Sequence, residues 1–150
     1  MKLSKTILLI EDDKDDQEFF IEAINGIKNA VLYFVAKNGK EAIAKLNSSP
    51  ILPDLIFSDI NMPLMDGIEC LSLIRMNPRT RNIPVVILTT DTRRTTLALK
   101  MGVKAFIKKP SSGKILTGLI DQIINPDFDS NYRIMNTFYI SSFFSAYQLC

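Results

Sequence analysis

Five short apolar runs, separated by segments with helical periodicity, constrain the fold of this chain more than any other feature. The runs occupy about residues 6–11, 31–36, 54–59, 84–89 and 104–108 and are rich in Ile, Val, Leu and Phe. Unbroken apolar runs of this length are typical of strands that are buried on both faces of a parallel sheet. The pattern therefore predicts a sheet whose parallel strands alternate with helices.

The segments between the runs repeat apolar side chains at helical spacing. We expect each of them to form an amphipathic helix that packs on the sheet, the last one capped by Ser111 or Ser112. Because crossovers between parallel strands are right-handed, five such units predict an α/β fold, a doubly wound five-stranded parallel sheet with helices on both faces. The residues that share a predicted helical face are Phe20, Ala23, Ile24 and Ile27; Ala42, Ile43 and Leu46; Leu71 and Ile74; and Leu116, Leu119, Ile120 and Ile123.

The composition indicates a globular protein and excludes several other classes. A chain of 150 residues that is 47% hydrophobic is long enough for one packed core. We place this domain at residues 1–125 and an aromatic-rich C-terminal extension at residues 126–150. The net charge of +2 by itself indicates neither nucleic acid nor an anionic membrane as a partner.

The cysteine and histidine contents and the apolar stretches predict the compartment. The two cysteines, Cys70 and Cys150, indicate a reducing environment, and the lack of histidine excludes His-based zinc sites and His general bases within the chain. The amino terminus lacks a signal-peptide pattern, and no apolar stretch approaches the roughly 20 residues that span a bilayer. We therefore expect a soluble, cytoplasmic protein with no direct DNA binding and no membrane association.

Polar side chains follow the predicted strands at the points where the strands end. Glu11 and Asp12 follow the first strand, Asp59 ends the third, Thr89 ends the fourth and Lys109 follows the fifth. In a parallel sheet these ends meet at one edge, and ligands bind there, near the reversal in strand order. We therefore expect the five side chains to converge on one site.

The carboxylates among these side chains predict a bound cation. Two unit charges about 4 Å apart interact by roughly 4 kcal/mol at an effective dielectric of about 20, so clustered acids repel one another or take up a proton. A divalent cation together with Lys109 would balance Glu11, Asp12 and Asp59. Oxygen ligands favour Mg²⁺ over zinc. A carboxylate such as Asp59 can also attack phosphorus, and the cation and Lys109 would then neutralise the phosphoryl oxygens.

Four segments of the chain resemble one family. They are ILLIEDD at residues 7–13, LIFSDINMPLMDG at 55–67, PVVILTT at 84–90 and GVKAFIKKP at 102–110. Taken together with their spacing, they are similar to the two-component receiver domain, the response-regulator module of the chemotaxis type, over about residues 5–124. The resemblance implies the flavodoxin-like strand order 2-1-3-4-5.

The resemblance also implies a phosphoacceptor and a set of metal ligands. Asp59 would accept a phosphoryl group from a phosphohistidine on a sensor histidine kinase or a histidine phosphotransfer protein. Asp12, Asp59 and the backbone carbonyl of Asn61 would bind Mg²⁺, and Glu11 would support the ion through water.

Further roles follow from the same resemblance. Thr89 and Lys109 would contact the phosphoryl group, and Thr89 and Phe106 would form the switch that reports phosphorylation. Strand alternation independently predicts that Lys108 points away from the site if Lys109 points into it. The resemblance also favours a cis bond between Lys109 and Pro110.

The chain departs from the family pattern at several positions. Glu11 stands where an aspartate is common, and Thr90 stands where a smaller residue is common and could narrow access to the phosphoryl group. The interval over residues 89–102 is short, so we expect the fourth helix to start late or to be trimmed. Asn61 and Asp91 flank the site, where such residues help related receivers to position the attacking water. They predict a short-lived phosphoryl state.

Simpler explanations apply to other polar residues. We expect Asp13, Asp15 and Asp16 to cap the first helix and to complement its dipole. Gly67 and Gly102 suit special backbone geometry or helix ends. A solvated surface, not a binding patch, is the expected explanation for five arginines, which are Arg75, Arg79, Arg81, Arg93 and Arg94.

The C-terminal extension is rich in Phe and Tyr and contains no lysine. Ile140, Phe143, Phe144 and Tyr147 follow helical spacing, whereas residues 138–140 could equally form a strand. The extension is too short for a DNA-binding domain. We expect it to dock on the domain, to dock on a second copy in a homodimer, or simply to extend the core.

These observations predict a single-domain response regulator that signals through contacts with a downstream target protein. It would catalyse its own phosphorylation and dephosphorylation but would not be a metabolic enzyme. One alternative is a receiver-like scaffold that works without phosphorylation. Another is an aspartyl-nucleophile phosphohydrolase, although that class expects an acid where Asn61 stands. A nucleotide-binding flavodoxin-like protein is disfavoured because no Gly-rich loop follows the first strand.

Overall fold

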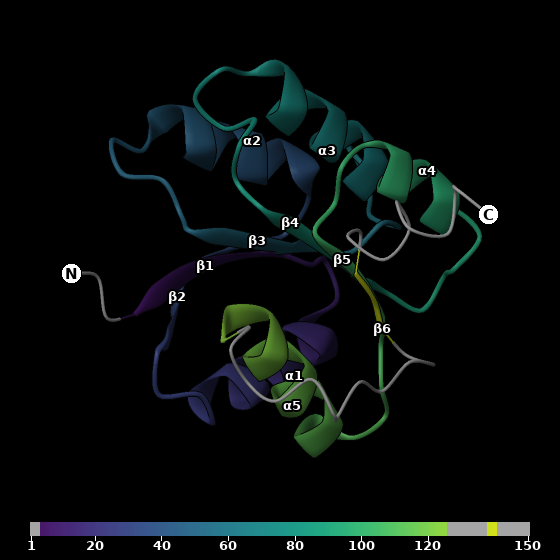
Figure 1. Cartoon of the computed structure of the whole chain (residues 1–150). Helices are drawn as coiled ribbons and strands as arrows, with labels where there is room; N and C mark the ends of the chain where they lie inside the picture. The colour runs from purple at the N-terminus through teal and green to yellow at the C-terminus, as the bar shows by residue number, and fades with distance from the viewer. Residues whose placement is uncertain (1–3, 126–137, 141–150) are drawn as a thin grey trace.

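The computed structural model describes residues 4–125 and 138–140 of the chain (Figure 1). Within these residues, five parallel strands alternate with five helices, and a short sixth strand follows. The strands are β1 (Lys5–Ile10), β2 (Ala30–Ala36), β3 (Leu55–Ser58), β4 (Val85–Thr89), β5 (Ala105–Lys108) and β6 (Phe138–Ile140). The helices are α1 (Lys14–Asn25), α2 (Gly39–Ser48), α3 (Gly67–Met76), α4 (Thr95–Lys100) and α5 (Gly113–Ile124).

The strands form one sheet in the order β2-β1-β3-β4-β5-β6. The pairs β1–β2, β1–β3, β3–β4 and β4–β5 are parallel, and β6 is antiparallel to β5. The parallel part confirms the predicted fold class and the order 2-1-3-4-5. The chain moves outward from β1 to β2 and then crosses back to β3, so the strand order reverses between β1 and β3, where ligands bind in open α/β sheets.

Strand alternation divides the core into two layers. Ile7 and Leu9 of β1 belong to the cluster that α1 and α5 cover, whereas Leu8 and Ile10 belong to the cluster on the other face. Figure 1 shows α1 and α5 below the sheet and α2, α3 and α4 above it. Because successive strand residues point to opposite faces, each unbroken apolar run supplies both clusters at once.

The helices present the predicted apolar faces to these clusters. The residues expected on those faces are buried, except Ile43, which is half-buried. Ser112 caps α5, because its side chain accepts a hydrogen bond from the Ile115 amide. The predicted shortening of the fourth helix is confirmed: α4 has six residues and no side-chain hydrogen bond at its N-cap. None of the helices in the described part of the chain could cross a bilayer.

The edge of the sheet beyond β5 carries a segment of the C-terminal extension. β6 pairs Phe138 with Ile107, Tyr139 with Phe106 and Ile140 with Ala105. The strand alternative for residues 138–140 is therefore the one that the structure shows. The predicted helix through Phe143, Phe144 and Tyr147 lies outside the described residues.

Candidate functional site

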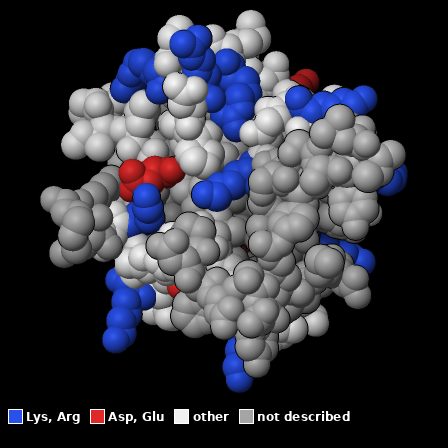
Figure 2. All heavy atoms as spheres, viewed as in Figure 1, with Lys and Arg blue, Asp and Glu red and all other residues white. Residues whose placement is uncertain are grey.

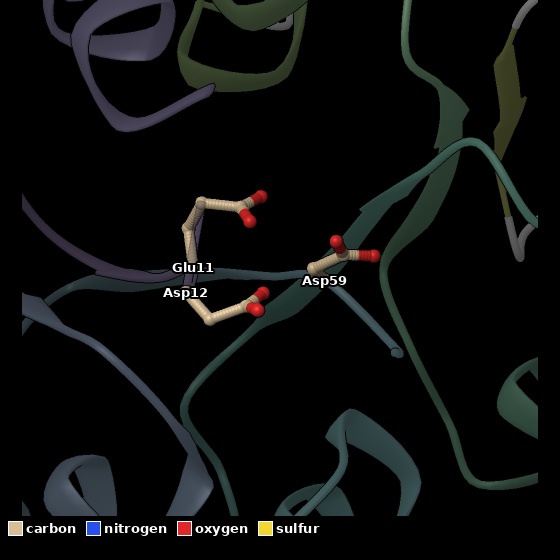
Figure 3. Close-up of side chains that lie close together, drawn as sticks. All are labelled: Glu11, Asp12 and Asp59. Carbon is tan, nitrogen blue, oxygen red and sulfur yellow. The ribbon is translucent and has the colours of Figure 1, made fainter. Parts of the chain in front are cut away.

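Three carboxylates meet beyond the carboxyl ends of β1 and β3. The last residues of these strands, Ile10 and Ser58, are neighbours in the parallel register. Glu11, Asp12 and Asp59 therefore leave the sheet at the same edge, and Figure 3 shows their side chains together there. One carboxylate oxygen from each residue lies within 4.8 Å of the others. The ligand set, oxygen atoms alone, suits a hard dication such as Mg²⁺.

Lys109 connects this cluster to β5 and α1. Its Nζ lies 2.7 Å from Glu11 Oε2, 2.7 Å from Asp16 Oδ2 and 3.0 Å from Asp59 Oδ2. Burial alone would lower the pKa of Lys109, but hydrogen bonds to Asp16 and Glu11 and the charge of Asp59 outweigh it and raise that pKa. The ammonium therefore stays charged and holds three acids together.

The two lysines at the end of β5 point in opposite directions, as strand alternation predicts. The Lys109 side chain is 13% exposed, whereas Lys108 is exposed. The backbone amide of Lys109 donates to the Thr89 carbonyl at 2.9 Å, which places the lysine beside the end of β4. The bond between Lys109 and Pro110 is trans, so the expectation of a cis bond was wrong.

Glu11 is the most deeply buried acid of the cluster. It is 3% exposed, and burial raises its pKa to about 7, although the contact with Lys109 and the Asp13 amide act in the opposite direction. Its Oε1 accepts a hydrogen bond from the Asp13 amide at 3.1 Å. Because this pKa lies near neutral pH, an added positive charge nearby would favour the ionised form of Glu11.

Asp59 is held from both sides. Its Oδ1 accepts a hydrogen bond of 2.7 Å from the Ile60 amide, and its Oδ2 faces Lys109. The backbone at the start of α3 passes so close to Asp59 that a Cβ on Gly67 would collide with the Asp59 carbonyl oxygen. The prediction that Gly67 serves backbone geometry is therefore confirmed, since only glycine permits this approach.

Thr89 and Phe106 lie where the sequence predicted them, at the carboxyl end of β4 and in β5. Thr89 is 1% exposed, and its Oγ1 accepts a hydrogen bond of 3.2 Å from the Asp91 amide. Phe106 is fully buried in the core cluster beneath α3 and α4. Thr90 lies at the surface and lines a cavity of about 410 Å³ that Glu11 and Lys109 also line. The switch roles of Thr89 and Phe106 stay predictions.

The contacts of two residues near the site are not evident from the sequence. Asp13 does cap α1, since its side chain accepts from the Asp16 amide. Asp16, however, also pairs with Lys109 and so joins the acidic cluster. Arg94 donates to Asp66 at 3.0 Å and to Asn61 at 2.9 Å. The nearness of Asp16 to the end of β1 could have indicated its role, but no sequence signal connects Arg94 with either partner.

The arginines do not share one explanation. Arg93 is 86% exposed, and basic side chains appear at separate places on the face shown in Figure 2. Arg75, in contrast, donates to the carbonyls of Met101, Ile83 and two other residues, and Arg79 donates to two carbonyls near the end of α2. Arg79 is exposed, as expected, although it also binds these carbonyls. The expectation of a merely solvated surface was wrong for Arg75 and Arg94, which are half-buried and connect separate segments of the chain.

Comparison with known proteins identifies the family. The model of the response regulator receiver domain matches residues 7–121. The chain belongs to this family. The resemblance noted in the sequence is thus confirmed, and the chain is a receiver over most of its length.

Individual relatives agree with this assignment. The response regulator Rcp1 of Synechocystis is 38% identical over 93 residues, which are 58% of this chain and 63% of that protein. The manganese-bound form of Rcp1 has a TM-score of 0.71 and 28% identity, over 81% of this chain and 95% of the other. The phosphorylated cyanobacterial phytochrome response regulator RcpA has a TM-score of 0.72 and 29% identity, over 81% and 94%.

Other relatives are much longer than this receiver. The chain matches the sensor histidine kinase CheAY of Helicobacter pylori at 28% identity over 83% of its own length, but it spans only 16% of that protein. It spans 31% of a protein-glutamate methylesterase of Methanococcoides burtonii, at 33% identity over 72% of this chain. Receiver domains thus occur in proteins of different activity, so the family defines the module and not the output.

Proposed function

We propose that Asp59 accepts a phosphoryl group and that the protein is a response regulator, which passes the signal on through protein contacts. The contact between Lys109 Nζ and Asp59 Oδ2, at 3.0 Å, carries this proposal. It places a permanent positive charge beside the carboxylate that would gain the phosphoryl oxygens. The phosphorylated RcpA and the manganese-bound Rcp1 support it, because both have the same fold.

Phosphorylation would proceed by attack of an Asp59 carboxylate oxygen on phosphorus. The bond from phosphorus to the histidine nitrogen of the donor breaks as the new oxygen–phosphorus bond forms, and the imidazole leaves with the electron pair. Lys109 would form an ion pair with the phosphoryl oxygens, and the Thr89 hydroxyl would donate a hydrogen bond to one of them. The buried position of Thr89 at the carboxyl end of β4 supports this role.

Asp12, Asp59 and the Asn61 backbone carbonyl would bind Mg²⁺, with Glu11 acting through water. The clustered oxygens of Glu11, Asp12 and Asp59 support this ligand set. Glu11, Asp16 and Asp59 share one ammonium, and Asp12 lies beside Glu11 and Asp59. The carboxyl groups thus outnumber the cation, and a bound dication would offset this imbalance. When bound, the ion would neutralise charge on the transferring phosphoryl group.

The partners follow from this chemistry. The donor would be a sensor histidine kinase or a histidine phosphotransfer protein, and the receiver of the signal would be a downstream protein. Phosphorylation adds negative charge at Asp59. A conformational change at Thr89 and Phe106 would transmit this signal to the surface near β5. The extension at residues 126–150 would take part in docking on the domain or on a second copy, and we place the protein in the cytoplasm.

The test is incubation of the purified full chain with acetyl phosphate and Mg²⁺, followed by intact-mass measurement. We expect one added phosphoryl group in the native protein and none in Asp59→Asn. Omitting Mg²⁺ should abolish labelling. A native chain that stays unlabelled would contradict the proposal and favour a scaffold that works without phosphorylation. Steady release of phosphate over many turnovers would instead indicate a phosphohydrolase.

A further inference from the structure

A chain of polar contacts ties the loop after β4 to the loop after β3. The Arg94 guanidinium donates through Nη1 to Asp66 Oδ2 at 3.0 Å and through Nη2 to Asn61 Oδ1 at 2.9 Å. Asn61 Nδ2 in turn donates to Asp91 Oδ2 at 2.9 Å. The Asp91 amide donates to Thr89 Oγ1, so the chain of contacts reaches the site itself.

These contacts engage both ends of the Asn61 side-chain amide. Its oxygen accepts from Arg94, and its nitrogen donates to Asp91. The Asp91 carboxylate is engaged as well, because Arg93 donates to both of its oxygens. Hydrogen bonds from Arg93 and Asn61 hold the pKa of Asp91 well below its usual range, so it remains an anion that accepts from both. The polar groups that flank Asp59 on this side therefore hydrogen-bond to one another.

We propose that Arg94 is a positioning residue that prolongs the phosphoryl state by holding the Asn61 amide in its contact with Asp91, so that the amide cannot turn to orient an attacking water. The inference rests on the proposed phosphorylation of Asp59 and concerns only how fast the phosphoryl group is lost. It runs opposite to the short-lived state that Asn61 and Asp91 predict from sequence alone.

The reaction that Arg94 slows is hydrolysis of the aspartyl phosphate. A water oxygen attacks phosphorus, the bond from phosphorus to the Asp59 oxygen breaks, and the carboxylate leaves with the electron pair. The protons of the water remain on the released inorganic phosphate, which loses one of them to solvent near neutral pH. The step needs no partner beyond water, but a group that orients this water accelerates it.

The free Asn61 side chain could orient the water, whereas the bound one cannot. The amide oxygen is the atom that would accept a hydrogen bond from an attacking water. The bond from Arg94 takes one of its two acceptor positions and, together with the bond from Nδ2 to Asp91, fixes the direction in which the oxygen points. Asp66, the other partner of Arg94, caps α3 through hydrogen bonds from the Ile68 and Glu69 amides. The guanidinium is therefore anchored to a helix end, and its planar fork suits two acceptors at once.

Arg93 offers a matched control. It lies next to Arg94 and carries the same charge, but its hydrogen bonds go to Asp91, two residues away in its own loop. Its side chain is 86% exposed, whereas that of Arg94 is 35% exposed and reaches residues 28 and 33 positions away. A general effect of lost positive charge would appear in both variants, and an effect of the held amide only in one.

The experiment measures decay of the phosphoryl group in Arg94→Gln, Arg93→Gln and the native chain. Each protein is labelled with acetyl phosphate and excess Mg²⁺, freed of the donor and followed by intact mass. We expect Arg94→Gln to lose the label about tenfold faster, below the roughly 100-fold that a full general base supplies. Arg93→Gln should decay at the native rate, because Asn61 still accepts from Arg94 and still donates to Asp91 in that variant. Adding Asn61→Ala to Arg94→Gln should restore slow decay, because the amide that orients the water is then absent. The backbone carbonyl that would bind Mg²⁺ remains in this variant.

Several outcomes would overturn the inference. Equal or slower decay in Arg94→Gln would do so, and so would fast decay that persists after Asn61→Ala is added, because a disturbed fold would then explain the rate. If Arg94→Gln fails to fold, Arg94→Lys keeps the charge but loses the fork, and native decay in that variant contradicts the role. A native chain without any label contradicts the proposed function itself, whereas labelled chains with equal decay contradict only the role of Arg94.

Discussion

The two flanks of Asp59 are built in different ways. On one side, the side chains of Lys109 and Glu11 are 13% and 4% exposed. The contacts of Lys109 connect three segments of the chain. On the other side, the side chains of Arg93 and Arg94 are 86% and 35% exposed. Arg94 joins the loops after β3 and β4, whereas Arg93 contacts Asp91 within its own loop. The low dielectric of the interior strengthens the buried contacts and makes an unpaired buried charge costly. Solvent screens the exposed contacts of the arginines.

This difference separates the groups proposed to carry out the chemistry from those proposed to control its rate. The buried flank determines which groups are charged, and a change there alters both the stability of the fold and the reaction. Rearranging contacts on the exposed flank costs little free energy, so residues there can control the rate of phosphoryl loss without destabilising the fold. Four measurements test this comparison, in order of decreasing effect.

The largest effect is expected for Lys109→Met. The change removes the ammonium that Glu11, Asp16 and Asp59 share and leaves buried carboxylates unpaired. We expect the free energy of unfolding of the metal-free protein to fall by about 3–5 kcal/mol, measured by urea denaturation. Lys108→Met, on the exposed face of the same strand end, should change it by less than about 0.5 kcal/mol. Similar effects of the two changes would show that the buried flank is not special.

A second large effect is expected where the two flanks meet, at the start of α3. In Gly67→Ala the new methyl group collides with the Asp59 carbonyl oxygen and must displace backbone. We expect a loss of about 3 kcal/mol, at the upper end for overpacking. Gly118→Ala is the control, because its Cβ would meet nothing within 4 Å in the interior of α5. That change should stabilise the protein by about 0.5–1 kcal/mol.

The pH dependence of stability tests the charge state of the buried flank. Burial raises the pKa of Glu11 from 4.5 to about 7 in the folded protein. Between these values the folded state binds more protons than the unfolded state, so the free energy of unfolding falls as pH rises through this window. We expect Glu11 to contribute a loss of roughly 3 kcal/mol in the metal-free protein.

The measurement compares the native chain with Glu11→Gln, which has no carboxyl group at this position. Urea denaturation at several pH values gives the difference in unfolding free energy, and other titrating groups largely cancel in it. The difference should change between pH 4.5 and 7. A difference that is constant across this range would contradict the raised pKa.

The smallest effects belong to the exposed flank. Arg94→Gln should lower the free energy of unfolding by about 0.5–1 kcal/mol, because it loses two partly exposed contacts. Arg93→Gln should leave the urea midpoint unchanged, since its side chain is almost entirely in solvent. Raising the salt concentration should reduce the loss in Arg94→Gln. A large, salt-insensitive loss would mean that this flank is as firmly built as the buried one.

The fold was predictable because its signals are local. The apolar runs that became β1 and β3 are short and continuous, and the strand ends that carry Asp59 and Lys109 could be located directly. Strand alternation was enough to separate Lys108 from Lys109. The extra strand β6 was less predictable, since residues 138–140 suit helix and strand alike and only pairing with β5 decides between them.

The remaining part of the site depends on contacts between distant residues. Asp16 looked like a helix-dipole acid, and Arg94 looked like surface charge, because sequence spacing does not show which side chains a fold brings within 3 Å. The Asn61 amide illustrates the same limit. Its position two residues after Asp59 is visible in the sequence, but the partners that hold it come from the loop after β4.

The alternation of strands and helices follows from the chain alone, because hydrophobic periodicity and strand polarity are local properties. The same properties predict which polar residues meet at one edge of the sheet, namely Glu11, Asp12, Asp59, Thr89 and Lys109. How those groups are charged and which neighbours restrain them depends on packing in three dimensions. Burial and hydrogen-bond partners set the pKa of Glu11 and the orientation of Asn61, and both arise when separate segments pack together.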